Sequence, residues 1–81
     1  MKLPRDVSGE ELARALQRLG YEKTRQTGSH MRLTSKAKGK EHNVTVPAHK
    51  QLTVGTLGQI LADVAANLQT SRDELIERLF G

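Results

Sequence analysis

The sequence predicts an α+β fold with one helix, three antiparallel strands and two further helices, in which the helices pack on one face of the sheet. Two observations predict it. Apolar residues recur with a helical period near both ends of the chain, and they alternate with polar residues between positions 29 and 46. A chain of 81 residues can build one modest core, so we expect a single domain over residues 1–81, with residues 1–7 as a flexible N-terminal segment.

The first helix is expected over residues 8–19. Ser8 can accept a hydrogen bond from the amide of Glu11, and the Glu11 carboxylate can accept one from the amide of Ser8, which is the reciprocal capping box. Three leucines follow at helical spacing: Leu12, Leu16 and Leu19. Gly20 is placed to adopt the left-handed conformation that ends a helix.

Three strands are expected after this helix. The segments with strand composition or alternation are residues 21–27, 29–34 and 42–46. A tight connection at Thr27-Gly28 joins the first two, and residues 35–41 have no apolar period, which is typical of an exposed hairpin loop. Pro47 ends the third strand because it has no N–H to donate.

Two helices complete the chain. The helical period returns at Leu57, and Thr56 is a candidate for the N-cap. The apolar residues of this long helix share one face: Leu57, Ile60, Leu61, Val64, Ala65 and Leu68. Ser71 and Glu74 have the spacing of a second capping box. The short last helix that follows has its apolar side formed by Leu75, Ile76, Leu79 and Phe80.

The composition excludes several classes of protein. The chain has no cysteine, so neither a disulfide framework nor a thiolate zinc site can hold the fold. Its two aromatic residues, Tyr21 and Phe80, are too few to stack successive RNA bases. No apolar run reaches membrane-spanning length, so we expect a cytoplasmic protein with no membrane partner.

Positive charge is concentrated in the middle of the chain. Residues 23–50 contain seven lysines and arginines against one glutamate, a net charge of +6, whereas the whole chain carries +4 and its remainder therefore −2. Such a block is typical of a surface that binds a polyanion. The alternative is that these cations only solvate exposed strands and a loop, and charge alone weighs the two interpretations evenly.

One histidine is expected on the uncovered face of the sheet. Successive strand side chains point to opposite faces, so if Met31 faces the helices, His30 and Arg32 face away. The same rule places Asn43 and Thr45 on that outer face. A basic face with an imidazole suits an RNA backbone, because the 2′-hydroxyl is an internal nucleophile and histidine is the usual proton carrier near neutral pH.

The residues alone leave other interpretations open. A surface histidine on a strand is more often only a surface residue, and His42 and His49 have weaker cases than His30. The three histidines match no compact metal-ligand motif, so no metal site is expected. Two non-enzymatic hypotheses remain: an RNA-binding module without catalysis, and a protein-interaction domain whose basic face meets an acidic partner.

A series of short motifs carries a family resemblance. In order along the chain they are Leu19-Gly20-Tyr21, Gly28-Ser29-His30, Val46-Pro47-Ala48-His49-Lys50, Gly55-Thr56-Leu57 and Ile60-Leu61. In this order and at this spacing they resemble the HicA family of toxin mRNA interferases. The resemblance covers about residues 8–79, and the succession of motifs in a small basic protein is specific.

The resemblance implies a fold similar to the double-stranded-RNA-binding domain and a ribonuclease that cleaves mRNA and halts translation. The catalytic histidine of the family belongs to the Gly-Ser-His motif, which here places it at His30. The family is not known for needing a metal or another cofactor, and a HicB-type antitoxin that covers the active face neutralises it. The expected partners are therefore single-stranded mRNA and that antitoxin.

Other candidate residues would support His30. The cations expected to bind RNA are Arg25, Arg32, Lys36, Lys38, Lys40 and Lys50. Gly28 is expected as a turn glycine, and the Ser29 side chain is expected to lean inward because it alternates with Met31, so that any role of Ser29 would come through its backbone. His49 could contact RNA, or its ring could order the turn before the long helix, and we favour the structural interpretation.

The charge at the start of the long helix bears on the non-catalytic hypothesis. Domains that bind double-stranded RNA by shape place basic residues there, whereas residues 54–59 contain no cation. The sequence therefore disfavours this alternative, and the resemblance implies a metal-independent endoribonuclease instead.

Overall fold

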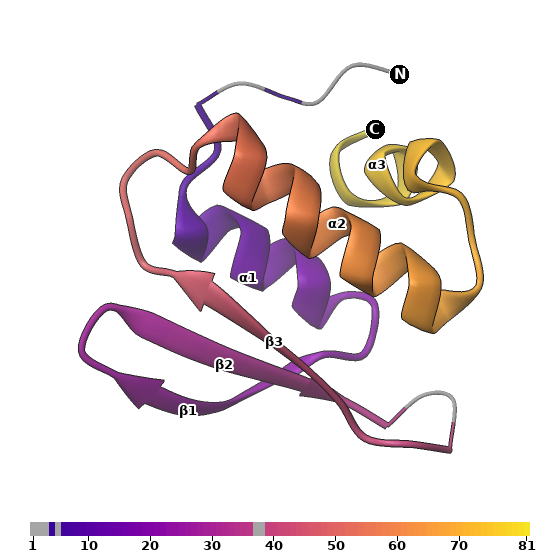
Figure 1. Ribbon diagram of the computed structural model, residues 1–81, viewed down its shortest axis with the longest axis horizontal. Helices are drawn as coiled ribbons and strands as arrows, with labels where there is room; N and C mark the ends of the chain where they lie inside the picture. The colour runs from indigo at the N-terminus through magenta and orange to yellow at the C-terminus, as the bar shows by residue number, and fades with distance from the viewer. Residues whose placement is uncertain (1–3, 5, 37–38) are drawn as a thin grey trace.

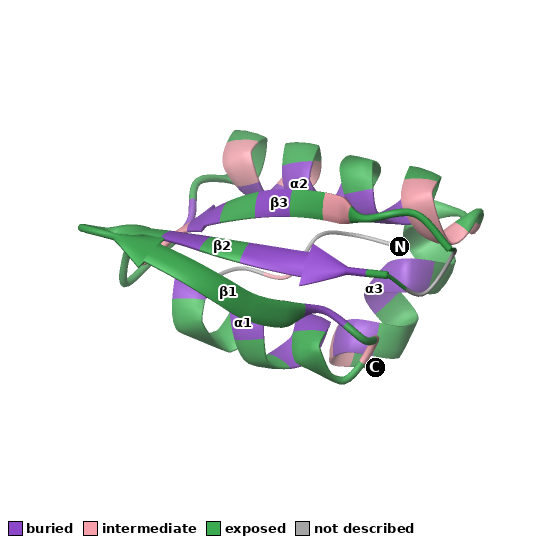
Figure 2. Ribbon diagram, turned by 90° about the horizontal axis from the view of Figure 1, so that it is seen from below, coloured by how far each residue is buried: buried purple, intermediate pink, exposed green. Residues whose placement is uncertain are grey.

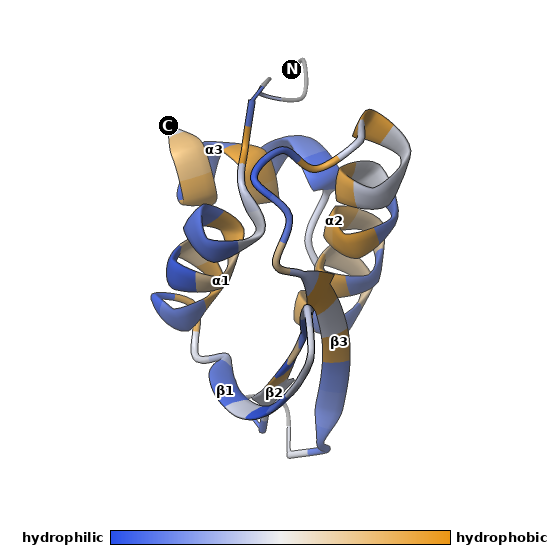
Figure 3. Cartoon of the chain, turned by 90° about the vertical axis from the view of Figure 1, so that its left-hand side faces the viewer, coloured by the Kyte–Doolittle hydropathy of each residue, from blue (hydrophilic) through white to orange (hydrophobic). Residues whose placement is uncertain are grey.

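The computed structural model describes residues 4, 6–36 and 39–81. The elements follow the expected order: α1 (Gly9–Gln17), β1 (Glu22–Thr27), β2 (His30–Ser35), β3 (His42–Pro47), α2 (Val54–Leu68) and α3 (Arg72–Phe80). The three helices lie on one side of the sheet, and no part of the described chain covers the other side (Figures 1 and 3). None of these helices is long and apolar enough to cross a membrane.

The sheet is antiparallel in the order β1-β2-β3. A two-residue turn, Gly28–Ser29, joins β1 to β2, and Gly28 has a φ of 58°, a conformation that favours glycine. In β2 and β3 the expected alternation is confirmed, since Met31, Leu33, Val44 and Val46 are buried, whereas His30, Arg32, Asn43 and Thr45 are exposed. Figure 2 shows this alternation of buried and exposed residues along β2.

The hydrophobic core lies between the sheet and the helices. Its fully buried side chains are large residues from both layers, among them Tyr21, Leu12, Leu16, Leu33, Leu57, Leu61 and Leu75. Every residue of β1 is exposed, so this edge strand adds nothing to the core and is held by its pairing with β2. The apolar faces predicted for the three helices are confirmed, although Leu68 and Phe80 are only partly buried, and Leu19, which is also partly buried, lies after the end of α1.

Two of the predicted helix starts are confirmed, and one is wrong. The Ser8 capping box of α1 is complete. The cap of α2 is Thr53, not Thr56, because Thr53 accepts the amide hydrogen of Thr56 at 3.2 Å. The first three residues of α2, residues 54–56, are not buried, and Val54 is 65% exposed, so the buried apolar residues that reveal the helix begin only at Leu57.

The cap of α3 forms only half of the predicted box. The Ser71 hydroxyl accepts the amide hydrogen of Glu74 at 3.0 Å, as expected. The Glu74 carboxylate accepts hydrogen bonds from the Thr70 hydroxyl at 2.7 Å and from Arg78 at 3.0 Å. These partners turn the carboxylate away from the Ser71 amide.

The segment before α1 packs against the connection between β3 and α2. Residues 1–3 and 5 of the expected flexible segment lie outside the described part of the chain. Val7 is buried, and its carbonyl accepts the amide hydrogen of Leu52 at 2.8 Å. The Gly9 amide donates to the carbonyl of His49 at 2.9 Å. The start of α1 and this connection therefore touch backbone to backbone.

We expect Gly9→Ala to destabilise the protein. A Cβ at position 9 would overlap the carbonyl oxygen of Pro47, a backbone atom that cannot turn aside. Overpacking of this kind costs about 1–3 kcal/mol in the free energy of unfolding, which urea denaturation measures. Gly55→Ala is the matched control, since a Cβ at that exposed helical position meets nothing within 4 Å. It should raise stability by about 0.5–1 kcal/mol, and equal effects of the two changes would contradict the packing argument.

A buried hydrogen-bond network joins the sheet to α2 at Tyr21. Its hydroxyl accepts from the side-chain amide of Asn67 at 3.1 Å and lies 2.8 Å from Nδ1 of His42, whose ring meets the tyrosine ring edge to face. Burial, aided by the negative charge of Asp63, raises the pKa of Tyr21 above 10.0, and the hydrogen bond from Asn67 opposes this only in part.

The raised pKa of Tyr21 predicts a loss of stability in alkali. The unfolded chain loses the phenolic proton near its ordinary pKa of about 10, while the folded chain still holds it. The contribution of Tyr21 is therefore complete below that pH and is lost as the pH rises toward the folded-state pKa. Urea unfolding between pH 8 and 11 should show this decline. Tyr21→Phe removes the sole tyrosine, so a decline of equal slope in that variant would contradict the prediction.

Candidate functional site

Three rows of side chains cross the uncovered face of the sheet. The strand register places Thr27, His30 and Pro47 side by side, which we call the histidine row. The arginine row comprises Arg25, Arg32 and Thr45, and the threonine row comprises Thr24, Thr34 and Asn43. Figure 2 has this face toward the viewer. Neighbouring rows are two residues apart along β2 and β3, or about 6.6 Å. In β1 the register shift between Lys23 and Arg25 makes Thr24 and Arg25 adjacent residues.

The backbone around His30 is held on both sides. His30 is the first residue of β2, paired with Thr27 in β1 and with Pro47 in β3. The turn before it is tied down as well, because the Ser29 carbonyl accepts the amide hydrogen of Ala48 at 2.6 Å. The imidazole itself is exposed and makes no hydrogen bond or ion pair with the described residues. A fixed backbone thus presents a free proton-transfer group to solvent.

His30 lies in a depression that also contains two of the predicted RNA-binding cations. The hollow measures about 250 Å³, and its lining is Arg25, Thr27, His30, Arg32 and Thr45. Sequence reasoning placed Thr45 on this face but did not single it out, and it missed Thr27. The register of the two-residue hairpin, in which Thr27 faces His30, was the signal that would have found Thr27.

Arg25 and Arg32 place two positive charges side by side in the depression. Arg25 lies directly opposite Arg32 across β1 and β2. Neither arginine makes an ion pair or side-chain hydrogen bond with any residue that the structure describes. Like charges facing each other across strands destabilise a sheet, and a bound anion would relieve this repulsion. Guanidinium groups match phosphate oxygens in geometry, so the depression suits a phosphate beside an imidazole.

The lysines predicted to bind RNA do not gather at this depression. Lys36 and Lys40 lie in the connection between β2 and β3, beyond the far end of β2 from His30, and that end is about 17 Å from His30 along the strand. Lys36 lines a separate hollow of about 260 Å³ that also contains Glu22 and Glu41. Lys38 lies outside the described residues. Lys36 and Lys40 therefore lie too far from His30 to share its depression.

Lys50 lies at the other end of the sheet. It is exposed in the connection from β3 to α2, three residues after Pro47, which pairs with His30. Lys50 is the first cation after Pro47 along the chain, and it lies outside the depression. Its contact with RNA stays a prediction.

One expectation about a neighbouring side chain is wrong, and another stays a prediction. The side chain of Ser29 does not lean inward but is exposed, because the turn interrupts the strand alternation on which that expectation relied. The ring of His49 makes no hydrogen bond or ion pair within the described chain, and its backbone carbonyl holds the turn instead by accepting from Gly9. An RNA contact of His49 stays a prediction.

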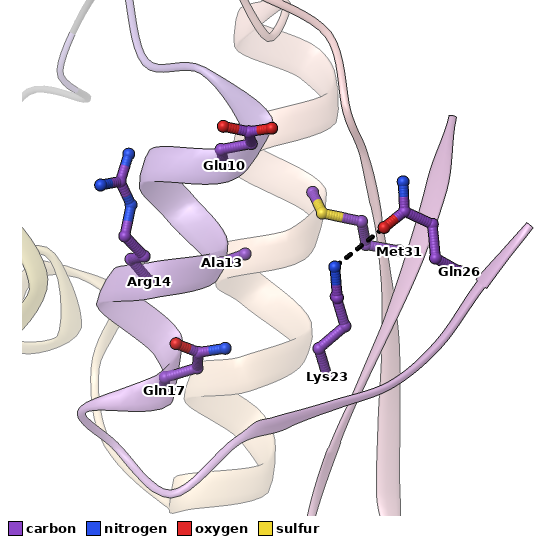
Figure 4. A pocket seen from close by; sticks show the side chains of 7 residues that line it. All are labelled: Glu10, Ala13, Arg14, Gln17, Lys23, Gln26 and Met31. Atoms are coloured by element: carbon purple, nitrogen blue, oxygen red, sulfur yellow. Dashed lines mark hydrogen bonds between the residues drawn. The ribbon is translucent and has the colours of Figure 1, made fainter. Parts of the chain in front are cut away.

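A second depression, between α1 and β1, has a different character (Figure 4). It measures about 300 Å³ and is lined by Glu10, Ala13, Arg14, Gln17, Lys23, Gln26 and Met31. Its charges are mixed in sign, and the Lys23 ammonium already donates to the side chain of Gln26 at 2.8 Å. The hollow at His30 is therefore the better anion site. Within the described residues no group of three or more His, Cys, Asp or Glu side chains could hold a metal ion.

Comparisons with known proteins give one match. The family model for the HicA toxin of bacterial toxin-antitoxin systems matches residues 9–65. The matched region runs from α1 through the sheet into α2 and includes every residue of the His30 depression. No curated protein and no solved structure matches the chain significantly.

Proposed function

Because its family model matches residues 9–65, the chain belongs to the HicA toxin family of bacterial toxin-antitoxin systems, and from this we propose that it is an endoribonuclease that cleaves mRNA and inhibits translation. One observation carries the proposal. Among the residues that the structure describes, His30 has an imidazole without a partner and shares a depression with two unpaired arginines on a sheet face that none of these residues covers. These are the groups needed to move a proton and to hold a phosphate.

The proposed reaction is an internal transesterification of RNA. The 2′-oxygen attacks the adjacent phosphorus, the bond from phosphorus to the 5′-oxygen breaks, and a 2′,3′-cyclic phosphate and a 5′-hydroxyl result. His30 takes the proton of the 2′-hydroxyl as general base, or gives one to the leaving 5′-oxygen as general acid. One histidine performs only one of these transfers in a given step, so water exchanges the other proton and we expect a modest rate.

Arg25 and Arg32 would act on the phosphate in this scheme. Their guanidinium groups bind its non-bridging oxygens and offset the negative charge that develops as the 2′-oxygen attacks. Because Arg25 and Arg32 lie opposite each other on neighbouring strands, both guanidinium groups can reach the same phosphate. Thr27 and Thr45 complete the lining and can donate hydroxyl hydrogens to the ribose or phosphate.

Family membership implies an antitoxin partner. The site is shallow and open, so a protein that lies over the sheet can exclude RNA from it without changing the fold. We expect a HicB-type antitoxin to present carboxylates to Arg25 and Arg32, since these are the unpaired cations beside His30. Charge-reversal variants of the two arginines should then lose affinity for both RNA and the antitoxin.

The test is cleavage of purified RNA by the purified chain in excess EDTA. We expect fragments that end in a 2′,3′-cyclic phosphate and begin with a 5′-hydroxyl, which mass spectrometry identifies. Cleavage that stops in EDTA would contradict the metal-independent mechanism. Binding of RNA without cleavage, both with the chain alone and with translating ribosomes present, would favour the non-catalytic RNA-binding module instead.

A further inference from the structure

The threonine row forms a chain of hydrogen bonds across all three strands. The Thr34 hydroxyl donates to Oδ1 of Asn43 at 2.6 Å, and it lies 2.9 Å from the hydroxyl of Thr24. A hydroxyl has one hydrogen, which Thr34 gives to Asn43, so Thr24 is the donor in the second pair. Thr34 is only 8% exposed, so this hydroxyl is held in a buried position.

These bonds orient the side chain of Asn43. Because Oδ1 accepts from Thr34, the nitrogen Nδ2 faces away from this hydroxyl. Asn43 is exposed, and no described residue accepts from Nδ2. The open face therefore presents two N–H donors, beside an oxygen that keeps one free lone pair, in a fixed orientation.

The position of Asn43 relates it to the phosphate site. Asn43 lies two residues before Thr45 in β3 and on the same face, which places it about 6.6 Å from the arginine row. A phosphate held by Arg25 and Arg32 carries a nucleoside on each side. One of these nucleosides can reach the threonine row, whereas the other lies toward the histidine row.

We propose that Asn43 determines base specificity by binding an adenine next to the cleaved phosphate, an inference that rests on the proposed ribonuclease function. The carboxamide offers a donor and an acceptor side by side, the pattern that pairs with N7 and the N6 amino group of adenine. On the edge of the base that carries N7, this pattern selects adenine, because guanine carries the acceptor O6 where adenine carries the amino donor and the pyrimidines have no such edge. Asn43 therefore reads this edge and not the Watson–Crick edge. Thr34 is the positioning residue that keeps the carboxamide in register.

The experiment measures binding and cleavage separately. Four labelled hexanucleotides with one variable base in a background of uridine, UUUNUU, are bound to the His30→Ala variant at constant ionic strength, and the same RNAs are cleaved by the unmodified protein. We expect binding to the adenine RNA to be about tenfold tighter than to the other three. Cleavage should map to a bond adjacent to the adenine.

Three variants test the assignment. Asn43→Asp, which replaces the donors by acceptors, should reduce the preference for adenine to about onefold, and Thr34→Val should lower it in part. Gln17→Glu makes the same change from amide to carboxylate on the exposed face of α1 and should leave the preference intact. The ratio between bases is the readout, because a structural defect would weaken all four RNAs alike.

The outcomes separate this inference from the proposed function. Cleavage without a base preference, or a preference that survives Asn43→Asp, overturns the role of Asn43 and leaves the ribonuclease in place. Selective binding of the adenine RNA, together with no cleavage either of this RNA or of mRNA on translating ribosomes, overturns the ribonuclease and supports Asn43 as a reader of bases. Absence of binding to all four RNAs overturns both.

Discussion

His30→Ala is expected to reduce RNA cleavage by about 10²–10⁴-fold, the usual contribution of general acid-base catalysis. His30 is the only imidazole in the depression with Arg25 and Arg32, so the described chain offers no substitute there. The His30 side chain is exposed and makes no hydrogen bond or ion pair with the described residues. Its loss should therefore leave the free energy of unfolding within about 0.5 kcal/mol of that of the unmodified protein. Single-turnover cleavage and urea denaturation measure the two quantities.

His49→Ala is the informative comparison for this prediction. His49 is also exposed, lacks ring contacts and lies near the same end of the sheet, but it does not line the depression. We expect this variant to keep most of its cleavage activity. Equal losses in the two variants would contradict the assignment of the proton transfer to His30 alone, and full activity of His30→Ala would rule it out.

How much of this site the sequence could predict differs between neighbouring strands. In β2 the apolar residues Met31 and Leu33 identify the buried face, so the exposure of His30 follows from alternation. The choice of His30 as the catalytic residue came from the family resemblance, because many exposed strand residues share its environment.

The position of Arg25 could not be predicted in the same way. β1 has no buried residue, so its sequence has no pattern from which the two faces could be told apart. Simple alternation would put Lys23 and Arg25 on one face. The register shift between them places Lys23 opposite Leu33 on the helix side and Arg25 opposite Arg32 on the open side. The bulge thus creates the arginine pair, and only the structure reveals it.

The same limit applies to the lysines and the helix cap. The basic block appears in the sequence as one feature, but the hairpin sends Lys36 and Lys40 to the far end of β2 from His30. The α2 cap was misplaced by three residues because an exposed first turn has no apolar period to detect. In both cases the position depends on how the chain packs in three dimensions, which the local sequence does not specify.

The double variant Arg25→Gln, Arg32→Gln is expected to weaken RNA binding and to stabilise the fold. Each lost contact between a guanidinium and a phosphate should cost about tenfold in affinity. If each arginine neutralises one phosphate, the slope of log K against log salt should fall by about 1.4. The free energy of unfolding should rise by about 0.2–1 kcal/mol, since two like charges no longer face each other.

A variant that binds RNA more weakly but is more stable shows that the two arginines form a binding site and do not hold the sheet together. Residues that hold the sheet together would lose stability when replaced, whereas these two should gain it. Lys36→Gln, Lys40→Gln is the matched control, with the same change of charge at the far end of β2. It should lower affinity for long RNA and leave the cleavage rate of bound RNA nearly unchanged, while the arginine variant lowers both. A double arginine variant that unfolds more easily and still cleaves would show that phosphate binds elsewhere on the protein.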